Sequence, residues 1–167
     1  IEFDLTGTVK NANENFLSLM GYSLAEVRGR HHSMFCEPEI VEAPEYAAFW
    51  SDLAEGKLHD GEFKRIGRGG REVWIRASYN PVFDRFGKIA KIVKIATDVT
   101  QEKLRHAEFE GQVAAINKSQ AVIHFDLEGT ILDANEGFTR IFGYTPDALV
   151  GFDPARLVAR GEDRRTI

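Results

Sequence analysis

Hydrophobic and polar positions in the first quarter of the chain change from strand-like to helix-like spacing. Between residues 1 and 12, two short β-prone runs flank Thr6-Gly7, a pair typical of a tight hairpin turn. Asn13 then stands where a helix N-cap belongs, and apolar residues at helical spacing predict a short helix that ends at Gly21. Residues 23–26 read Ser-Leu-Ala-Glu, which is the spacing of a capping box. This region is therefore expected to hold two strands and two short helices.

The following residues predict one more helix and then a run of strands. A loop is expected from Gly29 to Ala43, and Pro44 fits the first turn of a helix that has an aromatic side and ends at Gly56. Three segments rich in β-branched and aromatic residues come next: Gly61–Ile66, Glu72–Val82 and Lys88–Asp98. This order predicts an α+β fold, in which an antiparallel sheet carries helices on one face.

Residues 102–119 contain no proline and have apolar residues at helical spacing, so they predict a connecting helix. The helix either covers the domain that follows it or forms a coiled coil that transmits a signal. One or two heptads do not separate these alternatives.

The opening pattern returns 122 residues later in the chain. The segments 1–30 and 123–152 are identical at thirteen of thirty positions without a gap, which indicates a duplicated domain rather than a solenoid repeat. We expect a first domain at residues 1–100, a connecting helix at 101–119, and the amino-terminal half of a second, incomplete domain at 120–167. The chain is thus interpreted as an excerpt from a longer protein.

Composition and charge exclude several functional classes. The 167 residues are 43% hydrophobic and 28% charged, as in ordinary globular domains. A formal net charge of −5 without a basic run argues against nucleic-acid binding. The single cysteine, Cys36, cannot form an internal disulfide, and no apolar stretch approaches the roughly 20 residues of a membrane span. We therefore expect a cytoplasmic location and no direct membrane contact.

Several motifs together resemble a PAS sensory domain. They are Asp-Leu-x-Gly-Thr, Ala-Asn-Glu-x-Phe and Gly-Tyr, followed by Gly69–Trp74 and the terminal Asp98-Val99-Thr100. The tandem arrangement is similar to the PAS pairs of bacterial methyl-accepting chemotaxis proteins, and less closely to those of sensor histidine kinases. The resemblance implies a five-stranded sheet that encloses a ligand cavity with its helices. It also implies a homodimer and a chemotaxis or kinase output domain in the same parent chain.

Asp98 and Thr100 lie where the last predicted strand passes into the connecting helix. Their side chains can accept hydrogen bonds from the free amides of a helix start. The PAS resemblance implies that this motif joins the sheet to the output helix and transmits the signal. The alternative is that both residues only cap the helix, and the two roles are compatible.

The segment Gly29–Met34 and Trp50 resemble the Arg-His-x-x-Met segment and the later helix tryptophan of flavin-binding PAS domains in aerotaxis receptors. The resemblance implies FAD, with Arg30 pairing with the pyrophosphate, His31 donating a hydrogen bond to it, and Trp50 forming an apolar wall. Asn13 completes the candidate cofactor site. Ser33 departs from the family, where an acidic residue stands, and Trp50 as an ordinary core residue is the alternative.

Haem, or no cofactor, is the other possibility for the cavity. Haem sensors of this family use a histidine ligand, in many cases on the helix before the long strands, but residues 44–56 contain none. His59 and the adjacent His31 and His32 remain as candidates, and no Cys/His grouping has the spacing of a metal site. The alternative function is a ligand-free PAS unit that serves only in dimerisation or docking.

Residues 3–9 resemble the Asp-x-Asp-Gly-Thr opening of haloacid-dehalogenase phosphatases. In that class the second aspartate is the general acid, whereas this chain has Thr6 in the first copy and Glu128 in the second. We therefore interpret Asp4 and Asp126 as turn residues and expect a non-enzymatic module without catalytic residues.

Overall fold

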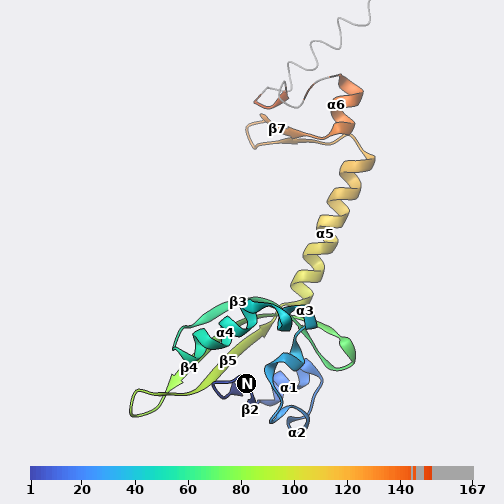
Figure 1. Ribbon diagram of the computed structural model, residues 1–167. Helices are drawn as coiled ribbons and strands as arrows, with labels where there is room; N and C mark the ends of the chain where they lie inside the picture. Colours follow the sequence, from blue (N-terminus) through green and yellow to red (C-terminus); the bar gives the residue numbers. More distant parts are fainter. Residues whose placement is uncertain (144, 146–148, 152–167) are drawn as a thin grey trace, which may run out of the picture. The chain divides into compact units, whose positions relative to one another are not determined.

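The computed structural model describes residues 1–143, 145 and 149–151. The chain divides into two compact units, residues 1–104 and 105–167, which are described separately (Figure 1). Most of the predicted half domain beyond residue 143 lies outside the described residues.

The first unit is built around one antiparallel sheet. Its elements in chain order are β1 (Glu2–Phe3), β2 (Val9–Asn11), α1 (Glu14–Met20), α2 (Leu24–Val27), η1 (His32–Phe35), α3 (Pro38–Glu42), α4 (Pro44–Ala54), β3 (His59–Ile66), η2 (Arg68–Gly70), β4 (Glu72–Phe83) and β5 (Ile89–Asp98). The strand order is β2-β1-β5-β4-β3, with every neighbouring pair antiparallel. The short helices α1 to α4 lie on one face of this sheet (Figure 1). The predicted α+β architecture with five strands is confirmed.

The helix α5 (Thr100–Ser119) follows β5, and the second unit begins within it. The second unit then forms the hairpin β6 (Ile123–Phe125) and β7 (Ile131–Ala134) and the helix α6 (Glu136–Phe142). These elements repeat β1, β2 and α1 of the first unit, as the internal duplication predicts.

Local capping explains why the first helices begin and end where the sequence predicts. The side chain of Asn13 accepts a hydrogen bond from the amide of Phe16 at 3.1 Å, and Gly21 ends α1 in the left-handed conformation at φ 78°. Asn135 and Gly143 do the same for α6. Such caps satisfy backbone groups that a helix end leaves free.

The hairpin turns depend on an aspartate that precedes each of them. Asp4 Oδ1 accepts hydrogen bonds from the amides of Thr6 (3.1 Å) and Thr8 (2.9 Å), while Gly7 supplies the positive φ of 86°. Asp126 makes the equivalent bond to the amide of Thr130 at 2.7 Å. Both aspartates therefore hold turns, as expected from the sequence.

The prediction of a loop from Gly29 to Ala43 is wrong, because this segment contains the short helices η1 and α3. The ring of His31 accepts a hydrogen bond from the amide of Ser33 at 3.2 Å and so caps η1. Pro38 occupies the first turn of α3, where a missing amide hydrogen costs nothing. Short one-turn elements lack the apolar periodicity by which longer helices are recognised.

The core lies between the inner sheet face and α1, η1 and α4. Alternate residues of β4 point inward, and Val73, Ile75, Ala77 and Tyr79 are all buried. They pack with side chains from β1, β2, β5 and the helices, among them Phe3, Val9, Phe16, Met20, Phe35, Trp50, Leu53 and Ile92. This alternation is the pattern of a sheet with one face packed on a core.

We expect Asp4→Asn to lower the free energy of unfolding by about 1 kcal/mol, because two turn amides lose a charged acceptor. Burial acts to raise the pKa of Asp4, but hydrogen bonds from Lys10, Thr6 and Thr8 outweigh it and hold the pKa well below its ordinary range. A lowered pKa in the folded state adds stability that is present above the unfolded pKa of about 3.9 and is lost as the pH falls through the folded value.

The measurement is urea unfolding at pH 7 and at pH 3, with Asp60→Asn, an exposed aspartate of β3, as the control. The destabilisation should shrink at pH 3 and be absent in the control. A variant as stable as the wild type at pH 7 would show that Asp4 does not support the turn.

Candidate functional site

The interior of the first unit contains a fully buried histidine, His32, at the start of η1. Its Nδ1 lies 2.8 Å from the hydroxyl of Tyr46, and its Nε2 lies 2.9 Å from the hydroxyl of Tyr79. The Tyr79 hydroxyl also accepts a hydrogen bond from Arg65 at 3.2 Å, so it is free to donate its own proton to Nε2. The Nδ1–H of His32 then donates to Tyr46, which gives a continuous chain of hydrogen bonds across the core.

Burial determines the protonation of this chain of hydrogen bonds. It lowers the pKa of His32 well below its ordinary value, and the nearby cations Lys94 and Arg65 act in the same direction. Burial also raises the pKa of Tyr79 to about 12, against the opposing effect of Arg65. The imidazole is therefore neutral and the phenol protonated at neutral pH.

Trp50 of α4 lies in an aromatic cluster on the same side of the core. Its ring centroid is 5.4 Å from that of His32, 5.5 Å from that of Phe49 and 5.9 Å from that of His31. The indole is 7% exposed, and its Nε1 has no hydrogen-bond partner within the described part of the chain. Trp50 is thus both a core residue and an unused donor.

Two cations are buried in this interior. Arg65 of β3 and Lys94 of β5 are 5% and 2% exposed, and no acid is among the buried side chains of the described residues. Lys94 Nζ and Arg65 Nε have no hydrogen-bond partner there. With Trp50 Nε1, three buried donors therefore face the interior without an acceptor, although buried polar groups are normally paired.

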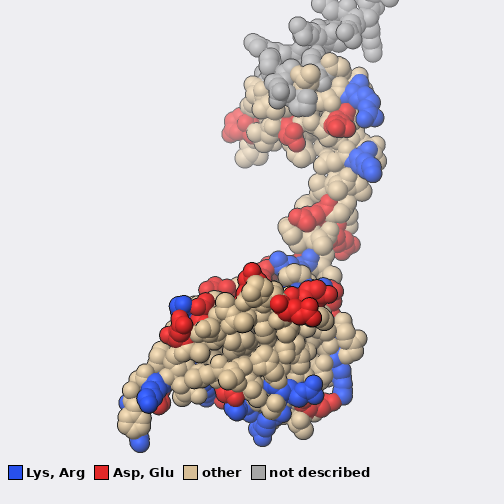
Figure 2. Space-filling model, viewed as in Figure 1, with Lys and Arg blue, Asp and Glu red and all other residues tan. Residues whose placement is uncertain are grey.

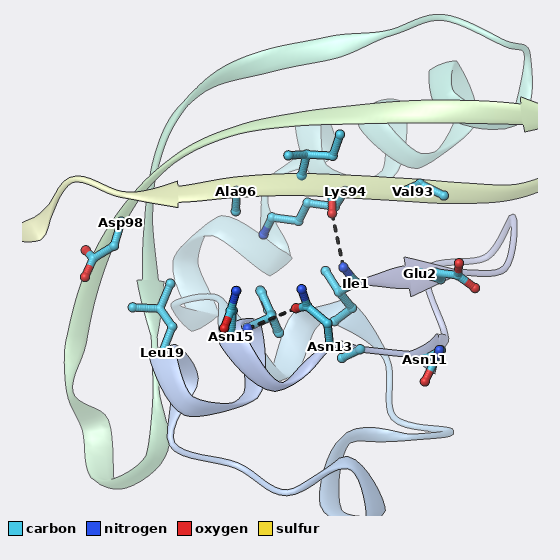
Figure 3. A pocket seen from close by; sticks show the side chains of 13 residues that line it. Ile1, Glu2, Asn11, Asn13, Asn15, Leu19, Val93, Lys94, Ala96 and Asp98 are labelled. Atoms are coloured by element: carbon cyan, nitrogen blue, oxygen red, sulfur yellow. Dashed lines mark hydrogen bonds between the residues drawn. The ribbon is translucent and has the colours of Figure 1, made fainter.

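Lys94 lies on a pocket between β5 and α1. Its Nζ is 4.9 Å from the ring centroid of Tyr79 and 5.6 Å from that of Phe16, so aromatic faces partly stabilise a charge there. Figure 3 shows its side chain extending from β5 into the space above α1. The pocket has a volume of about 630 Å³ and is lined by Ile1, Glu2, Asn11, Ala12, Asn13, Asn15, Phe16, Leu19, Val93, Lys94, Ile95, Ala96 and Asp98.

The structure separates the four residues of the expected flavin site. His31 and Trp50 are neighbours, and Arg30 is exposed on a different hollow that it shares with Tyr22 and Met34. Asn13 lines the pocket of Lys94 instead.

The ring nitrogens of His31 already have protein partners. Nε2 lies 2.9 Å from the carbonyl oxygen of Thr6, and Nδ1 lies 2.9 Å from the hydroxyl of Ser33. The ring therefore joins the β1–β2 turn to η1 in this structure.

Four buried residues were not predicted from the sequence to lie in the interior: His32, Arg65, Tyr79 and Lys94. The two-residue period of a strand could have predicted that Lys94 points inward, because Ile92, Lys94 and Ala96 lie on the same face of β5. A lysine at an inward position between apolar residues is unusual.

The exit from the sheet is held by Asp98 and Thr100. Asp98 Oδ1 accepts hydrogen bonds from the amide (2.9 Å) and the hydroxyl (2.6 Å) of Thr100. The same hydroxyl accepts a hydrogen bond from the amide of Trp74 in β4 at 3.0 Å. The first residue of α5 is therefore bonded to β4 as well as capped, while a role in signalling stays a prediction.

Charged side chains add further contacts around this junction. Glu62 of β3 forms ion pairs with Arg76 at 2.8 Å and with Lys103 of α5 at 2.6 Å. Lys103 also lies over the ring of Trp74, with 5.3 Å from Nζ to the centroid. Acidic and basic side chains intermingle on the first unit near the start of α5 (Figure 2). Exposed pairs are weak individually, but here several share partners.

Two other kinds of site are absent from the described part of the chain. It contains no helix with the length and apolar character needed to cross a membrane. It also contains no group of three or more His, Cys, Asp or Glu side chains placed to hold a metal ion.

Several curated bacterial proteins are similar to this chain. The biofilm dispersion protein BdlA of Pseudomonas aeruginosa is 40% identical over 144 residues, which cover 86% of this chain and 34% of that protein. The aerotaxis receptor of Escherichia coli is 32% identical over 105 residues, covering 63% of this chain and 20% of the receptor. A blue-light-activated histidine kinase of Brucella ovis is 29% identical over 172 residues, covering 93% and 35%. The chain thus spans about a third or less of each relative.

Family models and solved structures agree with the fold. A crystal structure of the PAS domain of a protein from Colwellia psychrerythraea matches with a TM-score of 0.53 at 22% identity, covering 60% of this chain and 85% of that one. A model described as the PAS fold matches residues 9–96, and a model described as a PAS domain matches residues 119–167. The chain therefore belongs to the PAS family and carries two PAS domains in tandem, as do sensors of the chemotaxis type.

Proposed function

We propose that the first PAS domain registers a redox or small-molecule cue in its interior and passes it to α5 within a chemotaxis-type receptor. The relatives support a sensory role in signal transduction. The observation that carries the proposal is the set of three buried donors without acceptors, Trp50 Nε1, Arg65 Nε and Lys94 Nζ. A ligand with acceptor atoms would satisfy groups that otherwise weaken the folded state.

The route from the interior to α5 runs along β4. Tyr79 faces the interior. In the same strand, the backbone amide of Trp74 donates a hydrogen bond to the hydroxyl of Thr100 at the start of α5. A ligand that favours one arrangement of the interior would shift β4 and thus the population of one α5 geometry. In this proposal Asp98 and Thr100 transmit the signal.

The cofactor we propose is FAD, in line with the similarity to the aerotaxis receptor. The donor set fits, because the indole of Trp50 offers a flat apolar wall and Arg65 Nε is unused. The exposed Arg30, next to His31 in the chain, is accessible to a pyrophosphate. Bound FAD would supply reversible redox chemistry. The rings of Phe49, His32 and Trp50 are in mutual contact and would have to separate to admit it.

A ligand-free docking domain is the second candidate function, and the same ring contacts favour it. We propose a homodimer for both candidate functions, and a docking domain would act through it. Apolar side chains exposed on α5 support such pairing, because Phe109, Val113 and Ile116 recur at spacings of four and three. We also propose an output domain in the same parent chain, a cytoplasmic location, and no catalytic activity of this region.

The absorbance spectrum of the purified protein, recorded before and after reduction, tests the FAD proposal. Expressed with riboflavin and haem precursors supplied, the protein should show a flavin spectrum that bleaches on reduction. A haem spectrum would show that the cofactor is haem and not FAD. An uncoloured protein would contradict the redox-sensor proposal, and the ligand-free docking domain would remain as the candidate function.

Trp50→Phe should lower the flavin content about tenfold, because it removes the indole donor and part of the wall while it keeps an aromatic core residue. Trp74→Phe on the outer sheet face is the matched control and should keep its flavin. Circular dichroism would check that both variants fold. Equal flavin content in the two variants would show that Trp50 is not part of the binding site.

Thr100→Val should loosen the tie between α5 and β4. The variant removes the hydroxyl that accepts the Trp74 amide hydrogen, so hydrogen exchange at that amide should accelerate about fivefold or more. The measurement is hydrogen exchange followed by NMR, with Thr97→Val, an exposed threonine of β5, as the control. Unchanged exchange at Trp74 in Thr100→Val would contradict the proposed coupling.

A further inference from the structure

The amine of Lys94 is the most unusual group of the first unit. The side chain is 2% exposed, yet it lines the pocket between β5 and α1, and its Nζ has no hydrogen-bond partner in the described part of the chain. The neighbouring side chains do not compensate for burial of this amine, because the aromatic faces of Tyr79 and Phe16 stabilise its charge only in part. A buried ammonium normally has an anionic partner.

The buried charged side chains around this amine are all basic among the described residues. Arg65, 5% exposed, is the other buried cation, and no carboxylate is buried with them among the described residues. Burial, and then the charge of Arg65, act against the protonated amine and lower the pKa of Lys94 well below its ordinary value. An anion in the pocket would reverse this effect, so the interior is prepared for a negative group that no buried carboxylate of the described residues supplies.

We propose that the pocket between β5 and α1 binds a small organic monocarboxylate, with its carboxylate on Lys94 Nζ. The side-chain amide of Asn13 is a second donor, because its oxygen is engaged by the amide of Phe16 and its nitrogen remains available. The apolar part of the ligand would lie against Phe16 and Leu19. A volume of about 630 Å³ is ample for such a molecule.

Two acidic residues restrict the class of ligand to monoanions. Glu2 and Asp98 also line the pocket (Figure 3). Glu2 is paired with Lys91 at 2.7 Å, and Asp98 accepts hydrogen bonds from Thr100. A second carboxylate on the ligand would lie close to these two acidic groups, and is therefore disfavoured.

The second unit supports the role of the asparagine amide. Asn135, the counterpart of Asn13, donates from Nδ2 to the carbonyl oxygens of Asn117 and Gln120, each at 2.7 Å. The amide at this position therefore donates to oxygen acceptors in the second unit.

The two units differ at the neighbouring position. Gly137 approaches Gln120 so closely that a Cβ would lie 2.7 Å from the carbonyl oxygen. The first unit has Asn15 at this position.

This proposal does not depend on a flavin. Lys94 also belongs to the set of donors that carries the proposed function, but the carboxylate would bind in the pocket at α1, whereas the FAD proposal rests on Trp50 and Arg65. Either proposal can fail while the other stands.

The test measures the thermal midpoint and NMR chemical shifts of the protein with butyrate and with benzoate. Butyramide and benzamide serve as uncharged probes of the same shape, and succinate serves as the dianion. The monocarboxylates should raise the midpoint in a saturable way and shift the Asn13 side-chain amide signals, while the amides and succinate should not. The protein is used with its cofactor content determined, so that occupancy of the interior is known.

Lys94→Met should abolish the carboxylate effect, with a dissociation constant raised about tenfold or more. The variant should itself fold well, since methionine fills the same space without an unpaired amine. Lys88→Met, an exposed lysine of the β4–β5 turn, is the matched control and should bind like the wild type. Equal responses to butyrate and butyramide, equal responses of Lys94→Met and wild type, or no response to either acid would overturn the proposal.

Discussion

The hydroxyl and ring of Tyr79 connect the parts of the first unit. The hydroxyl bonds to His32 of η1 and Arg65 of β3, while the amine of Lys94 in β5 lies over the ring. Through His32 the same network reaches Tyr46 of α4. One buried phenol therefore links four elements around the core. A hydrogen-bonded network of this kind gives the interior a specific geometry at the expense of apolar packing.

This arrangement places two basic side chains in the core at a cost in stability. A core in which well-packed hydrophobic residues replaced Arg65 and Lys94 would be more stable. The three unused donors are sites where local rules of protein stability are broken, and such sites are commonly functional. Tyr79 and Trp74 belong to one strand, and the amide of Trp74 donates a hydrogen bond to Thr100 at the start of α5. In the proposed function, a change near the phenol would therefore reach α5 through β4 alone.

Sequence could predict the parts of the fold that short-range chemistry determines. Asn13, Gly21 and Asp4 each act within a few residues of their own position, and the structure shows the cap, stop and turn that the motifs indicate. The long strands were also predictable, since their β-branched and aromatic residues persist over many positions. The segment Gly29–Ala43 was not, because its one-turn helices are stabilised by single contacts rather than by a repeated pattern.

The candidate site was less predictable because it depends on which residues meet in space. Arg30 and His31 are adjacent in the chain, yet one lies on the surface and the other is held in contact with Trp50. Lys94 is far from Tyr79 in sequence but directly opposite it in the β4–β5 register. Such pairing follows from the relative alignment of two strands, and a one-residue slip would turn Lys94 to the opposite sheet face. The alignment that places this amine beneath α1 is therefore the step that converts an ordinary PAS sheet into a pocket with a buried cation.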